Sequence, residues 1–179
     1  LAVFGLIAQL VIQVGLGSLG TLAAYAGTVL LGLVILYAMF LGIVGLLTRH
    51  SVIGFARTIA PVQLVAFSTS STAAVMPLSI STAVGTLGVR SQTANLVIPL
   101  AATINMAGTA LYQTVAVLFL AQAAGLDLSM GVTVGVVVSV VAASIGAPGT
   151  PGVGVAILTQ IAAGAGIPAT GLPLVLGLD

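Results

Sequence analysis

A cluster of polar side chains interrupts the long apolar stretch that runs from Pro99 to Gln113. Thr103 and Thr109 supply hydroxyl groups, Asn105 supplies an amide, and a methionine and a glycine lie among them. Oxygen atoms of this kind are ligands for hard cations, and a hydroxyl can also donate a hydrogen bond to a carboxylate. The other use of such groups is hydrogen bonding between helices, at about 0.6 to 2 kcal/mol per bond. We favour a binding role, because polar groups at membrane depth are costly and gather along transport pathways.

The spacing of these residues suggests a common face. Asn105, Thr109 and either Tyr112 or Gln113 lie near positions i, i+4, i+7 and i+8. In a continuous helix, residues at these intervals share one side. We therefore expect this side to form one wall of a binding site.

The composition predicts an integral, multi-pass membrane protein. Hydrophobic residues make up 60% of the chain and charged residues only 3%, whereas soluble domains carry about 25% charged residues. With no Cys, one His and two acidic residues, the chain has too few of the side chains that form zinc sites or hydrolytic triads to favour either. We therefore expect no enzymatic activity. A net charge of +1 gives no support for a nucleic-acid partner.

Breaks rich in glycine, proline and hydroxyl residues divide the chain into segments. An apolar run that already begins at Leu1 without a Met suggests an internal part of a longer membrane protein. A helix needs about 20 apolar residues to cross a membrane, and this length separates spanning helices from shorter segments. They are an incomplete helix at 1–16, a membrane-spanning helix at 21–48, an interrupted segment at 51–89, a spanning helix at 91–125, a second interrupted segment at 129–167 and a new helix at 172–179.

The two interrupted segments are predicted to be re-entrant helical hairpins. Five consecutive hydroxyl residues (68–72) precede Pro77, and four glycines and two prolines lie within 144–154; neither stretch suits the middle of a spanning helix. If segment 51–89 enters and returns on one side, Arg49, Arg57 and Arg90 all lie on the cytoplasmic side, as the positive-inside rule favours.

Hairpins that enter from opposite sides, separated by a spanning helix, are typical of an inverted repeat with a binding site at the membrane midplane. The expected fold is therefore an all-α integral membrane protein, with an inverted-repeat domain that contains two re-entrant hairpins and a broken spanning helix.

Three motifs occur in the order found in a known family. Asn105-Met106-Ala107-Gly108-Thr109 resembles the Asn-Met-Asp-Gly-Thr motif of the dicarboxylate/amino acid:cation symporters, which include the glutamate transporters. The stretches 68–77 and 143–152 resemble that family's two hairpin tips. The resemblance extends over nearly all of residues 1–179.

This resemblance implies a secondary active symporter of acidic amino acids or dicarboxylates, driven by a sodium or proton gradient. It implies a homotrimer in the plasma (inner) membrane, surrounded by lipid, with an elevator-like movement of a transport domain. Residues 1–16 would belong to a scaffold helix and 21–179 to the transport domain, with the substrate-discriminating helix beyond Asp179.

The resemblance also implies roles for individual residues. Substrate contacts would come from the first tip, the central motif and the second tip, and cation contacts from the central motif and the second tip. The implied substrate-binding residues are Ser71, Thr72, Thr109, Thr150 and Gly154, and the implied sodium ligands are Ala101, Thr103, Asn105, Ser144, Ile145 and Ala147.

Ala107 is the main departure from the family motif, which usually has an aspartate that binds a cation. Without this carboxylate, a cation loses its strongest local attraction, so a homologue with impaired coupling is one alternative. A second alternative is an ion or solute channel lined by the two hairpin tips.

Overall fold

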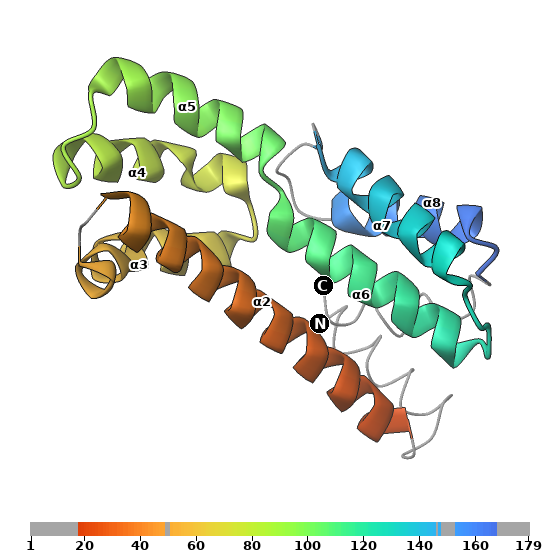
Figure 1. Ribbon diagram of the computed structural model, residues 1–179. Coiled ribbons are helices and arrows are strands. Elements are labelled where there is room, and N and C mark those ends of the chain that lie inside the picture. Colours follow the sequence, from red (N-terminus) through yellow and green to blue (C-terminus); the bar gives the residue numbers. More distant parts are fainter. Residues whose placement is uncertain (1–17, 49–50, 146, 148–152, 168–179) are drawn as a thin grey trace. The chain divides into compact units, whose positions relative to one another are not determined.

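The computed structural model describes residues 18–48, 51–145, 147 and 153–167. Every regular element in this part of the chain is a helix, which confirms the expected all-helical class. The helices are α2 (Ser18–Thr48), α3 (Val52–Thr69), α4 (Thr72–Gly85), α5 (Ser91–Ile104), α6 (Ala107–Ala123), α7 (Met130–Ser144) and α8 (Val153–Gly164) (Figure 1).

Three described stretches are long and apolar enough to cross a membrane: Gly20–Thr48, Val52–Thr69 and Ser91–Ala123. The first is the most apolar and lies within α2, where large side chains such as Leu30, Leu31 and Val34 are more than 60% exposed. A helix that is apolar all round and still exposes its large side chains is suited to lipid rather than water. The described part thus has the helices of a multi-pass membrane protein.

The chain divides into two compact units, which are treated separately here. In the described part of the chain, one unit contains residues from 34–106 together with 145, 147 and 153, and the other contains 18–33, 107–144 and 154–167. One boundary between the units lies inside α2, between Leu33 and Val34. Another lies between Met106 and Ala107, just before α6 begins.

The first unit contains a helical hairpin followed by α5. Helices α3 and α4 pack together although only Ser70 and Ser71 separate them, and α4 also packs against α5. Ser70 adopts the left-handed conformation (φ 47°, ψ 30°), and its N–H bonds to the Ala66 carbonyl. A left-handed residue commonly ends a helix by such a bond, so the chain reverses in two residues.

The tip of this hairpin is shorter than the sequence suggested. Ser68 and Thr69 are the last residues of α3, and each hydroxyl donates to the Val65 carbonyl, at 3.0 and 2.8 Å. Bonds of this kind satisfy a hydroxyl within its own helix. Pro77 lies inside α4 and does not end it.

The second unit has a core built mainly by α6, α7 and α8. Ala116, Val117 and Leu120 of α6 are buried against residues of the other two helices. Tyr25 of α2 joins this core, and its ring lies 4.8 Å from that of Phe119 between centroids. The remaining core members are Ala121, Val136, Val140, Leu158, Ala162 and Ile167.

Candidate functional site

The central motif interrupts the helix that carries it. Helix α5 ends at Ile104 and α6 begins at Ala107, so Asn105 and Met106 are not helical. Asn105 has φ −99° and ψ 72°, and its N–H donates to the Ala101 carbonyl at 2.8 Å. At such a break, the last carbonyls of one helix and the first N–H groups of the next lack helical partners. These groups can attract a cation and an anion, respectively.

This break corrects one expectation from the sequence. The segment was expected to be a broken helix, but its polar residues Asn105 and Thr109 were also expected to share one helical face, and helical spacing does not extend through the two non-helical residues. Thr109 lies in the first turn of α6 and is half-buried, whereas Asn105 is exposed. Asn105 is therefore the C-cap of α5, whereas Thr109 belongs to α6.

The expected cation ligands in the motif offer neutral oxygens only. The Ala101 carbonyl already accepts the bond from Asn105, and Thr103 donates its hydroxyl proton to the Leu100 carbonyl at 2.9 Å. The lone pairs of Thr103 and the side-chain amide oxygen of Asn105 have the chemistry of hard-cation ligands. A cation here would be held without a carboxylate, because Ala107 stands at the first position of α6.

The first hairpin tip positions Ser71 as the N-cap of α4. Its hydroxyl accepts a hydrogen bond from the N–H of Ala74 at 3.3 Å. Thr72 is the first residue of the helix and is exposed. A capped helix start presents further N–H groups that can receive a carboxylate.

A buried polar network connects α6, α7 and α8. Gln113 is completely buried, and its Nε2 donates to the Gly154 carbonyl at 3.0 Å. Ser144, the last residue of α7, is 3% exposed, and its hydroxyl lies within hydrogen-bonding distance of the Val140 carbonyl (2.8 Å) and Gln113 Oε1 (3.4 Å). One amide side chain thus joins the end of α7 to the start of α8.

The other predicted residues near the second tip differ in exposure. Ile145 is 55% exposed, whereas Ala147 is buried. Thr150 lies outside the described residues. Ser144 and Gly154 are therefore the predicted site residues of this region that the structure connects, through Gln113.

The sequence pattern offers Gln113 as one of two candidates for the polar face, and it predicts no role for this residue. The available signal was an amide in an apolar helix, four residues after Thr109. A buried amide must find hydrogen-bond partners. Its partners are 31 and 41 residues away in the chain, so no local pattern could identify them.

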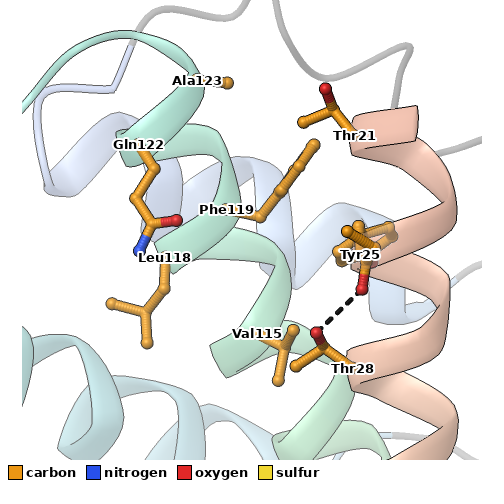
Figure 2. A pocket seen from close by; sticks show the side chains of 9 residues that line it. Thr21, Tyr25, Thr28, Val115, Leu118, Phe119, Gln122 and Ala123 are labelled. Atoms are coloured by element: carbon orange, nitrogen blue, oxygen red, sulfur yellow. Dashed lines mark hydrogen bonds between the residues drawn. The ribbon is translucent and has the colours of Figure 1, made fainter. Parts of the chain in front are cut away.

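A pocket of about 420 Å³ lies between α2 and α6, within the second unit. Figure 2 shows Thr21, Tyr25 and Thr28 of α2 facing Val115 and Phe119 of α6, with the Tyr25 hydroxyl pointing toward that of Thr28. The other lining residues are Ala24, Leu118, Gln122 and Ala123. The pocket contains none of the predicted site residues.

Acidic and metal-binding side chains do not gather anywhere in the described ranges: no group of three or more His, Cys, Asp or Glu residues could hold a metal ion there. The polar atoms that the described central motif offers a cation are hydroxyl, amide and carbonyl oxygens. This donor set suits a hard cation better than a transition metal, which prefers imidazole or thiolate ligands.

Comparisons with known proteins identify one family. The model of the sodium:dicarboxylate symporter family matches residues 1–179. The chain is 37% identical over 159 residues to excitatory amino acid transporter 3 of Mus musculus, covering 88% of this chain and 30% of the relative. It is 34% identical over 177 residues to the proton/sodium-glutamate symport protein of Bacillus subtilis, covering 99% of this chain and 41% of the relative. The chain thus spans less than half the length of these relatives.

Proposed function

Since the chain belongs to the sodium:dicarboxylate symporter family, we propose that it forms part of a secondary active transporter that couples uptake of an acidic amino acid or dicarboxylate to a cation gradient. The family is one of transporters, not enzymes. The similar proteins of mouse and Bacillus subtilis are named for excitatory amino acid and glutamate transport. These names support an acidic amino acid as the substrate class.

The observation that carries this proposal is the helix break at Asn105–Met106. It lies inside a 33-residue apolar stretch, Ser91–Ala123, that is long enough to span a membrane. Non-helical backbone at membrane depth is tolerated where it lines a cavity or is buried in protein. Broken spanning helices of this kind provide carbonyls for cations and N–H groups for anionic substrates.

On the substrate side, we assign carboxylate recognition to the hydroxyls and N–H groups at helix starts. These are Ser71 and Thr72 at α4 and Thr109 in the first turn of α6. The N–H of Gly154, near the start of α8, and Thr150 complete the proposed set. The Gly154 carbonyl accepts a bond from Gln113, and a substrate carboxylate would bind at the Gly154 N–H, because a carboxylate needs a donor.

On the cation side, we assign a sodium ion, with a proton as the alternative, to the neutral oxygens of the motif and the second tip. The cation is a transported species rather than a resident cofactor. The proposed ligand atoms belong to Ala101, Thr103, Asn105, Ser144, Ile145 and Ala147. Since Ala107 supplies no carboxylate, we expect weaker cation affinity than an aspartate would give.

We further propose the larger-scale features that the family resemblance implies. Segments 51–89 and 129–167 would be re-entrant hairpins related as an inverted repeat, and residues 21–179 would form a transport domain next to a scaffold helix at 1–16. The whole transporter would be a homotrimer in the plasma membrane that moves substrate by an elevator-like shift.

Uptake into proteoliposomes tests the proposal. The full-length protein is reconstituted, and accumulation of labelled L-glutamate, L-aspartate and succinate is measured with an inward sodium gradient, an inward proton gradient or neither. We expect one of these compounds to accumulate above its external concentration only with a cation gradient. A channel would equilibrate the label without concentrating it, and no saturable uptake under any gradient would refute the proposal.

The role of the helix break is tested by Asn105→Ala. If the Asn105 side chain contributes about 1.4 kcal/mol to the free energy of cation binding, its loss weakens binding about tenfold. We therefore expect the sodium concentration for half-maximal uptake to rise by about tenfold. The matched control is Asn95→Ala in α5, the helix that Asn105 follows, because Asn95 is exposed and its side-chain amide bonds to Ser91, four residues earlier in that helix. Equal shifts in both variants would contradict a specific role for Asn105.

A further inference from the structure

We propose that Gln113 is a positioning residue that holds the start of α8 against the end of α7, and that it thereby controls how long the substrate stays bound. This inference rests on the proposed function, since it concerns the helix start to which substrate binding is assigned. Nothing in the family comparison specifies this role for Gln113.

The geometry of the buried network supports a tether rather than a ligand. Gln113 is 0% exposed and uses both polar atoms of its amide: Nε2 donates to the Gly154 carbonyl at 3.0 Å, and Oε1 lies 3.4 Å from the Ser144 hydroxyl. The Nε2 donor therefore has a protein partner in Gly154, whereas Oε1 shares the single Ser144 hydroxyl proton with the nearer Val140 carbonyl. A side chain engaged in this way is poorly placed to bind substrate itself, but it determines where its partners lie.

The two partners of Gln113 lie at the two helix ends that the tether would hold together. Ser144 is the last residue of α7 and Gly154 is the second residue of α8. Gln113 lies near the middle of α6, whose neighbours Ala116 and Val117 are fully buried in the core. A rigid helix core therefore anchors the tether.

Loss of the tether should have a local effect. The Gly154 carbonyl is also placed to accept the usual helical bond from residue 158, and the Ser144 hydroxyl still donates to the Val140 carbonyl at 2.8 Å. Neither partner is stranded without a hydrogen bond when Gln113 is replaced by an apolar side chain of similar length. The expected result is a folded protein in which α8 starts less precisely.

Gln113→Met tests this proposal, because methionine is similar in length but cannot donate to Gly154. The matched control is Gln122→Met, the same change at an exposed position of the same helix. The first measurement is amide hydrogen exchange across the full-length protein. We expect exchange in peptides from 157–164 to become about 3- to 10-fold faster in Gln113→Met, the range for loss of one buried hydrogen bond, and to be unchanged in peptides from α3 and α4.

The second measurement is the kinetics of substrate binding, with whichever labelled compound the wild-type protein accumulates. We expect the dissociation rate to rise by about 3- to 10-fold while the association rate changes less than twofold. General destabilisation would instead speed exchange in all helices and reduce the amount of folded protein. Wild-type exchange in α8 together with a wild-type dissociation rate would overturn the proposal.

The two proposals fail in distinguishable ways. If the wild-type protein accumulates no substrate, the proposed function is refuted, whereas the exchange measurement still shows whether Gln113 holds α8. If the wild-type protein transports substrate but Gln113→Met matches Gln122→Met in both measurements, only the positioning role is refuted.

Discussion

At the scale of single residues, the candidate site depends on neutral oxygen atoms. Asn105 and Thr103 offer amide and hydroxyl oxygens, and Ala107 supplies no carboxylate beside them. Neutral dipoles attract a cation less strongly than a charge at the same distance. Cation affinity is therefore the property most sensitive to a change at position 107.

Ala107→Asp is expected to increase sodium affinity. A carboxylate would stand at the first position of α6, where the positive end of the helix also stabilises it. We expect the sodium concentration for half-maximal uptake to fall by about tenfold or more, equivalent to about 1.4 kcal/mol, and the Hill slope to rise if a further ion is coupled. The measurement is uptake as a function of sodium concentration in proteoliposomes.

Ala107→Asn is the matched control, because it has nearly the size of aspartate without the charge. It should produce at most a small part of the shift. If Ala107→Asp leaves both affinity and Hill slope unchanged, position 107 does not contribute to a cation site in this protein.

At the scale of elements, the structure shows how a few local interactions terminate helices in an apolar chain. Ser70 in the left-handed conformation ends α3, and Ser71 starts α4 through a bond to Ala74. An N-cap of this type contributes about 1 kcal/mol to helix stability. The same serine is also proposed to contact substrate, so its two roles must be separated.

Substitutions of Ser71 separate capping from substrate binding. Aspartate is an equally good N-cap, but its negative charge would repel a substrate carboxylate. We therefore expect Ser71→Asp to retain thermal stability and lose substrate binding, whereas Ser71→Ala loses about 1 kcal/mol of stability and has weakened binding. Thermal unfolding and equilibrium binding of the transported compound are measured on the same preparations. Wild-type affinity in Ser71→Asp would exclude this tip as the carboxylate site.

The packing of α8 gives a further prediction at this scale. Leu158 is 0% exposed within the core of α6, α7 and α8, whereas Leu31 of α2 is 62% exposed. In lipid, moving a leucine side chain between protein and surroundings changes the free energy little. The cavity left by its removal still costs van der Waals contacts with its neighbours. We expect Leu158→Ala to destabilise the protein by about 2 kcal/mol or more and Leu31→Ala by less than about 0.5 kcal/mol. Reversible unfolding in detergent micelles provides the comparison, and equal losses would show that the α8 core is not tightly packed.

At the scale of the whole molecule, the helical hairpin constrains membrane topology. Since α3 and α4 pack together across a two-residue turn, residues before α3 and after α4 should lie on the same side of the membrane. At about 1.5 Å per residue, α4 is about 21 Å long and falls short of the roughly 30 Å hydrocarbon core. Arg57 and Arg90 favour the cytoplasmic side for this end of the hairpin.

Cysteine labelling tests this topology, and the chain's lack of Cys simplifies it. Single variants Ser51→Cys and Thr86→Cys should react with a membrane-impermeant maleimide from the cytoplasmic side. Asp127→Cys, beyond the spanning stretch Ser91–Ala123, should react only from the opposite side. A membrane-permeant maleimide controls for reactivity, and labelling of Ser51→Cys and Thr86→Cys from opposite sides would contradict the hairpin topology.

The sequence by itself determined the class of protein and the approximate division into helices. A composition of 60% hydrophobic and 3% charged residues requires lipid around most of the surface, and stretches rich in serine, glycine and proline marked the interruptions because these residues act through local backbone geometry. The motif around Asn105 identified the family for the same reason, since its information lies in consecutive residues.

Only the tertiary structure decided which polar groups meet. The structure shortens the first tip to Ser70 and Ser71, because the hydroxyl groups of the preceding residues can bond within their own helix. It also places Asn105 before the helix that contains Thr109. It also connected Gln113 with Ser144 and Gly154. Such partners are selected by the packing of α6, α7 and α8, which depends on side-chain shape across distant parts of the chain rather than on local spacing.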